Sequence, residues 1–173
     1  MTAEKARLRA MEPEDLDFLY SMENDRELWN VGNTSVPYSR YVLHDYVAHS
    51  SNDIYRDCQV RLVVETASGE TAGLIDVFNF SAQHRRAEVS VAVSREFRRQ
   101  GIAASAVRQV MQYAVRTLHL HQLYAVIACD NAASLALFGG MGFERSGVLP
   151  DWLYDGEKYQ NGIVMCKILQ KNI

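Results

Sequence analysis

The run from Val93 to Val107 brings together positive charge, small residues and the start of a helix. A strand with alternating residue types ends at Val93, and apolar residues recur at the three-and-four spacing of one helical face from about Ile102 onward. Between them lie two arginines, and Gly101 and Ala103 let a bulky anion approach the backbone. The first N–H groups of a helix have no partner and carry partial positive charge. The run therefore predicts a diphosphate site at this strand-to-helix junction.

Two further segments follow in a definite order. A short apolar strand, Leu123 to Ala128, precedes Asn131, which is a good N-cap for a helix that ends in the glycine-rich stretch before Phe143. Farther along, Asp155-Gly156 predicts a tight turn between the last two strands.

Together these segments resemble the GCN5-related N-acetyltransferases, the GNAT family. Arg98-Arg99-Gln100-Gly101-Ile102-Ala103 is similar to the family's acetyl-coenzyme A signature, and the Asn131–Phe143 segment is similar to its element beside the pantetheine arm and the thioester. The resemblance extends from Thr71 to Ile168, including the last hairpin, and is looser before that. It implies an α+β (mixed α/β) fold: a single domain over residues 1–173, with a central mixed, mostly antiparallel sheet flanked by helices.

The resemblance also implies acetyl-coenzyme A (acetyl-CoA) as co-substrate. Backbone N–H groups of the strand that ends at Val93 would pair with the pantetheine amides and polarise the thioester carbonyl. The loop and helix start would hold the diphosphate. The implied cofactor-binding residues are Val91, Ala92, Val93, Arg98, Arg99, Gln100, Gly101, Ile102, Ala103, Ala104, Asn131, Ser134 and Phe138.

Acetyl transfer to an amine further requires that the amine lose a proton. Glu88 is our candidate catalytic base, acting through water. It shares one side of its strand with Ser90 and Ala92, and a carboxylate near apolar walls has a raised pKa, which suits a base. A structural salt bridge with Arg85 or Arg86, or simple attraction of a cationic amine, explains Glu88 equally well.

Phe138 departs from the family pattern, in which a Tyr at this position is thought to protonate the departing thiolate. Three interpretations stay open: water protonates the thiolate, another group substitutes, or the protein is catalytically weak. Thiols ionise at about pH 8.5, so an unassisted thiolate is a tolerable leaving group. We therefore expect an enzyme that uses direct attack in a ternary complex, with a non-catalytic acyl-CoA sensor or scaffold as the alternative.

Within the family the chain looks most like the spermidine N-acetyltransferases, with the ribosomal-protein N-terminal acetyltransferases next. The segments His84–Glu88 and Tyr159–Cys166 carry this likeness, whereas Asn33–Tyr38 lacks the acids that the polyamine enzymes have in that loop. The acceptor stays open between a polyamine such as spermidine, a protein N-terminus and another small amine. The candidate substrate contacts are Asp76, His84, Glu88 and Ser90.

Composition narrows the class of protein. The chain has 173 residues, of which 48% are hydrophobic, and a net charge of −3, which favours one globular domain and argues against a nucleic-acid partner. Three widely spaced cysteines predict buried free thiols in a reducing compartment, and His119-x-His121 lacks further ligands, so we expect no metal. No signal peptide or bilayer-spanning run is visible. We expect a cytoplasmic enzyme without a membrane partner, and a homo-oligomer is compatible with the sequence.

Local patterns predict the elements that position these residues. Alternation, capping residues and turn residues give the following order. We expect a strand over Ala6–Ala10, helices over Glu12–Asn24 and Ser39–His49, a loop over Asn30–Tyr38, and strands over Asp57–Thr66, Thr71–Phe80 and Arg86–Val93.

Overall fold

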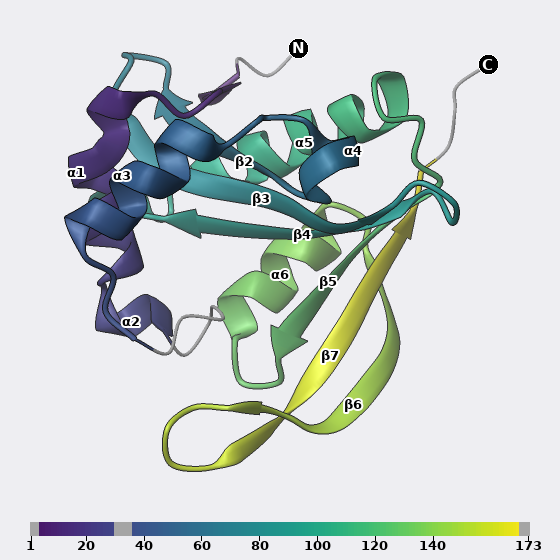
Figure 1. Cartoon of the computed structure of the whole chain (residues 1–173). Coiled ribbons are helices and arrows are strands. Elements are labelled where there is room, and N and C mark those ends of the chain that lie inside the picture. Colours follow the sequence, from purple (N-terminus) through teal and green to yellow (C-terminus); the bar gives the residue numbers. More distant parts are fainter. Residues whose placement is uncertain (1–3, 30–35, 170–173) are drawn as a thin grey trace.

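The computed structural model describes residues 4–29 and 36–169, and one seven-stranded sheet runs through them (Figure 1). The strands lie in the order β1-β2-β3-β4-β5-β7-β6. Strands β4 and β5 are parallel, and all the other neighbouring pairs are antiparallel. This sheet confirms the expected mixed, mostly antiparallel α+β architecture. Its strands are β1 (Ala6–Arg9), β2 (Val60–Thr66), β3 (Thr71–Ser81), β4 (Arg86–Val93), β5 (Gln122–Ala128), β6 (Glu144–Tyr154) and β7 (Tyr159–Ile168).

Helices cover the two faces of the sheet unequally. They are α1 (Leu16–Glu23), α2 (Arg26–Trp29), α3 (Arg40–His49), α4 (Ile54–Asp57), α5 (Ile102–Arg116) and α6 (Ala132–Gly140). On one face α5 and α6 share a core with Val89, and on the other α1 and α3 pack around Val63 and Leu74. The core beneath α1 and α3 contains no described residue of β5, β6 or β7. On the α1 and α3 side of the sheet, no described helix therefore packs on β5 or β7.

Local signals placed most elements correctly. Ser39 accepts the Val42 N–H and so caps α3, as expected from its side chain. The prediction of a strand beginning at Asp57 was wrong at its start, since β2 begins only at Val60. The Asp53 carboxylate accepts the Tyr55 N–H and so begins the short helix α4 in front of the strand. Of the loop predicted over Asn30–Tyr38, residues 30–35 lie outside the described residues.

The expectation of buried cysteines was wrong, because none of the three is buried. Cys58 and Cys129 are exposed, and Cys166 is partly exposed; all three are free thiols. Cys58 follows α4 with a left-handed φ of +56°, and Cys129 lies in the turn after β5, so neither side chain faces the sheet. Across residues 4–29 and 36–169, the helices are too short or too polar to cross a bilayer.

Candidate active site

Strands β4 and β5 separate along part of their length, and we call the opening between their two backbones the cleft. These parallel strands pair only from Arg86–Gln122 to Glu88–Tyr124. Beyond that point β4 stays with β3, whereas β5 follows β7 as far as Ala128. The two strands therefore diverge towards their C-terminal ends (Figure 1). The Glu88–Tyr124 pair is the last pair before they separate, and we call this point the closed end of the cleft.

The β4 backbone faces this cleft at alternate residues. Ser94 N–H donates to the Ala72 carbonyl on the β3 side at 2.9 Å. Because bonded and unbonded positions alternate along an antiparallel strand, Val91 and Val93 direct their N–H and C=O groups towards the cleft. Ala92 directs its own groups to β3 and packs its side chain in the core with α1 and α3. By position, the donors that could polarise a thioester belong to Val91 and Val93.

Helix α5 begins beside the open end of the cleft without a cap. Gly101 is its N-cap residue with a φ of +80°, no side chain caps the helix, and its first turn contains no acid. The first helical bond runs from Ser105 N–H to the Gly101 carbonyl at 3.1 Å, so the N–H groups of residues 102–104 have no partner among the described residues. Ser39 and Asn131, in contrast, cap α3 and α6 with side-chain oxygens. The start of α5 is thus left open for an anion.

The basic residues near this helix start differ in their partners. Arg98 folds back: its Nε donates to the Val93 carbonyl at 3.0 Å, and its Nη1 lies 3.7 Å from the Glu27 carboxylate on α2. Arg99 is exposed and has a left-handed φ of +62°. Sequence reasoning missed Lys5, yet a methyl group on the N-cap glycine would lie 3.3 Å from its ammonium nitrogen. Arg99 and Lys5 therefore supply the exposed positive charge at this point.

Four of the predicted cofactor residues have internal partners. Gln100 Nε2 donates to the Glu96 carbonyl at 2.9 Å, and Ile102 is buried in the core beneath the helix start. The Asn131 side chain accepts the Ser134 N–H at 3.0 Å, which confirms Asn131 as the N-cap of α6. These contacts shape the loop and the helix start beside the cleft.

Phe138 belongs to the apolar core that α6 forms on the sheet. Its side chain is 3% exposed and meets Phe143 edge to face, with ring centroids 5.0 Å apart. Val91 and Val93 pack against the same core. A phenylalanine suits this contact, and position 138 offers the cleft no hydroxyl.

Glu88 lies at the closed end of the cleft, on the face opposite α5 and α6. Its carboxylate accepts a hydrogen bond from Asn79 Nδ2 at 2.8 Å, and Tyr124 is its partner residue on β5. Burial, and then the charge of Glu88, raise the pKa of Tyr124. Arg85 instead donates to the His119 carbonyl at 2.8 Å. Among the described residues, Glu88 forms no salt bridge with either neighbouring arginine, and the donor to its carboxylate is the neutral Asn79 amide.

Two other predicted substrate contacts are Ser90, on β4, and His84, on the turn before β4. Ser90 is exposed on the same side of β4 as Glu88. His84 lies on the β3–β4 turn, where its N–H donates to Ser81 Oγ at 3.3 Å. The turn is beyond the closed end of the cleft, so the fold does not bring His84 to the cofactor loop.

Asp76 forms an ion pair. Arg61 Nε lies 2.6 Å from its Oδ1 and Nη2 lies 3.0 Å from its Oδ2, while the same guanidinium also pairs with Glu23 of α1. Burial disfavours the charge of Arg61, but the nearby Asp76 and Glu23 carboxylates outweigh it and raise the pKa of Arg61. The network joins β2, β3 and α1, so we propose that Asp76 is structural.

We expect Asp76→Asn to lower the free energy of unfolding by about 1–3 kcal/mol, because charge-assisted hydrogen bonds to Arg61 are weakened. The KM for the acceptor should change little. Denaturant unfolding and steady-state kinetics of the same variant test both statements. A raised amine KM at unchanged stability would instead assign Asp76 to the acceptor.

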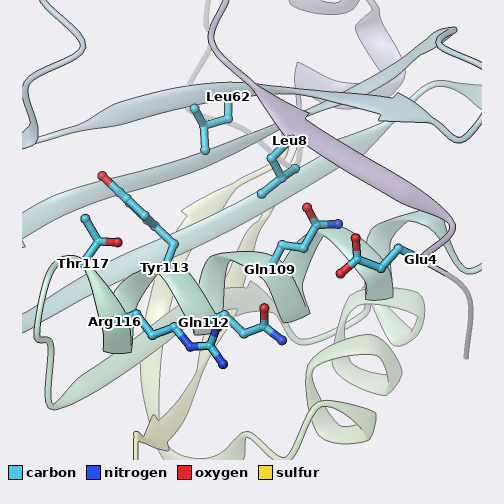
Figure 2. Close-up of a pocket in the computed structure, with 8 residues that line it drawn as sticks. All are labelled: Glu4, Leu8, Leu62, Gln109, Gln112, Tyr113, Arg116 and Thr117. Carbon is cyan, nitrogen blue, oxygen red and sulfur yellow. The ribbon is translucent and has the colours of Figure 1, made fainter. Parts of the chain in front are cut away.

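A hollow of about 400 Å³ lies away from the cleft, between α5 and the strands β1 and β2 (Figure 2). Leu8, Leu62 and Tyr113 form its apolar part, with Gln112 and Arg116 among its polar residues. The lining residues of α5 come from the second half of the helix, far from its open N-terminus. The hollow is therefore separate from the candidate active site.

The cleft between β4 and β5 lies next to the uncapped start of α5. This combination suits a long ligand with a diphosphate at one end and an amide-containing arm at the other. With a carboxylate at the closed end, this arrangement suits a transferase that takes an acyl group from a thioester. Residues 5–144 match the family model for the acetyltransferase (GNAT) domain. The chain therefore belongs to the GNAT family.

Individual relatives agree with this assignment. The chain is 30% identical to the spermidine N(1)-acetyltransferase of Escherichia coli (strain K12), over 95% of this chain and 87% of that protein. It is similar to the spermidine N-acetyltransferase of Vibrio cholerae, solved in complex with CoA and spermine, with a TM-score of 0.85, 26% identity and coverage of 95% and 96% of the two chains. The protein is an acetyl-CoA-dependent N-acetyltransferase.

Proposed function

We propose that the acceptor is a small, positively charged primary amine, with a polyamine such as spermidine as the first candidate. The observation that carries this proposal is the Glu88 carboxylate, which accepts a hydrogen bond from the neutral Asn79 amide at the closed end of the cleft. A carboxylate whose charge is not neutralised attracts an ammonium group and then accepts its proton. The names of the E. coli and V. cholerae relatives support a polyamine.

The chain's own groups would divide the reaction between them. The N–H groups of residues 102–104 and the charges of Arg99 and Lys5 hold the diphosphate end of acetyl-CoA. N–H groups of Val91 and Val93 align the arm and polarise the carbonyl. Glu88 takes a proton from the amine through water, and the amine attacks the thioester directly in a ternary complex.

The number of free carboxylates determines how many ammonium groups of the acceptor the protein can hold. The resemblance implies two acidic substrate contacts, Asp76 and Glu88. Arg61 neutralises the charge of Asp76, so the charge of Glu88 is the one available to the substrate. A polyamine would thus be held mainly at the nitrogen that reacts. A protein N-terminus and other small amines fit the same single contact, and the experiment below separates them.

We further propose a homo-oligomer in the cytoplasm. The V. cholerae relative has been solved as a dodecamer, and Trp152, Tyr154 and Tyr159 of the β6–β7 hairpin are exposed here. Exposed aromatic side chains are typical of surfaces that pair with another chain. Three free cysteines agree with a reducing compartment.

The acceptor can be identified by release of free CoA across a panel of spermidine, an amino sugar and a peptide with a free N-terminus. We expect CoA release with the polyamine, and a KM that rises with salt because the contact is ionic. Turnover of the peptide alone would move the acceptor to protein N-termini. Tight acetyl-CoA binding without turnover of any amine would instead favour an acyl-CoA sensor.

A further inference from the structure

Tyr124 occupies a position that the reaction described above does not yet use. It is the β5 partner of Glu88 in the last residue pair before the strands separate. The two side chains lie on the same face of the sheet, and Asn79 donates to the Glu88 carboxylate at 2.8 Å. A phenol and a carboxylate are thus cross-strand neighbours at the closed end of the cleft.

The reacting end of a ligand in this cleft must lie near that pair. A ligand arm that enters from the diverging C-terminal ends and bonds to Val93 and Val91 points towards Glu88. Three residues of strand separate Val91 from Glu88, or about 10 Å. Side chains extend several ångströms from the strand, which would bring the Tyr124 hydroxyl within reach of a thioester sulfur bound beside Val91.

A departing thiolate needs a proton, and position 138 cannot give one. Phe138 is buried against Phe143 and has no hydroxyl. A phenol alone is a weaker acid than a thiol, so it would protonate a thiolate poorly. A phenol that is itself reprotonated by a carboxylic acid avoids this difficulty, because a carboxylic acid is far stronger than a thiol.

We propose that the Tyr124 hydroxyl delivers the proton to the departing sulfur and that Glu88 replaces it. This inference rests on the proposed function. The ammonium first loses one proton to solvent through Glu88. When the amine nitrogen bonds to the carbonyl carbon, it loses a second proton to Glu88. As the C–S bond breaks, the Tyr124 hydroxyl protonates the departing sulfur. Glu88 then passes its proton to the Tyr124 oxygen. The products are the amide, the free thiol and the unchanged side chains.

The first test is Tyr124→Phe, which keeps the ring and removes the hydroxyl. We expect kcat to fall ~10²-fold, the usual worth of a positioned general acid, with the KM for acetyl-CoA unchanged. Tyr113→Phe is the matched control, because that phenol is also partly buried but lies on the second half of α5, at the separate hollow. The acetyl thioester of an aryl thiol, whose thiol is more acidic, should show a much smaller loss. A loss of equal size with both thioesters would overturn the relay and leave Tyr124 with a structural role.

The second test is rescue by Phe138→Tyr in the Tyr124→Phe protein. A hydroxyl supplied from α6 should restore at least ~10-fold of the turnover that Tyr124→Phe loses. Additive losses in the double variant would contradict the proposal. Slow hydrolysis of acetyl-CoA without amine gives the same readout, because the sulfur leaves in that reaction too. The hydrolysis assay thus tests Tyr124 as the proton donor even if the proposed amine is wrong.

Discussion

Replacing Gly101 with valine is expected to weaken acetyl-CoA binding by at least ~10²-fold while the protein still folds. Gly101 has a φ of +80°, a conformation that β-branched residues adopt only with strain. The added methyl groups would also stand at the open helix start, where the diphosphate must approach the N–H groups. The three atoms nearest to the new Cβ, at 3.2 to 3.7 Å, all belong to the flexible Lys5 side chain, which can move aside. Calorimetric titration with CoA measures the effect.

Gly69→Val is the matched control for backbone strain. Gly69 has a φ of +89° in the β2–β3 turn, and nothing lies within 4 Å of an added Cβ. Both variants should lose similar stability in denaturant unfolding, and only Gly101→Val should lose CoA affinity. Normal CoA affinity in a folded Gly101→Val protein would mean that the diphosphate binds elsewhere.

Glu88→Gln is expected to lower kcat with the true amine by ~10²-fold or more, the usual contribution of a general base. The amide keeps an oxygen that can accept the hydrogen bond from Asn79, so the strand geometry is preserved. CoA affinity should stay unchanged, because Glu88 lies at the opposite end of the cleft from the helix start. Steady-state kinetics and CoA titration on the same sample separate the two effects.

Glu14→Gln provides the control, because Glu14 is exposed in the short turn of helix after β1, the edge strand on the far side of the sheet from β5. Its kinetics should match the wild type. If Glu88→Gln turns over the amine as fast as the wild type, the carboxylate is structural, and the relay through Tyr124 would lose its proton source as well.

The features that the sequence alone determined depend on residues close together in the chain. A helix N-cap acts over three residues, as Asn131 does with Ser134, and a strand end followed by Arg98–Ala103 defines its own loop. Periodicity likewise predicted α5 and its buried side within one segment. For the same reason the open helix start could be expected from the sequence. Short-range signals also compete with one another, as Asp53 shows, because its cap turned the expected beginning of a strand into α4.

The tertiary structure alone decided which groups meet across long separations. Lys5 reaches Gly101, Glu27 takes up the charge of Arg98, and Arg61 neutralises Asp76. These pairings depend on which strands neighbour each other and in which register, and no local propensity encodes that. The register between β4 and β5 has the largest consequence, because a shift of one residue would turn the side chains of one strand to the opposite face. That register places Tyr124 beside Glu88, and the early end of the pairing opens the cleft in which both can act.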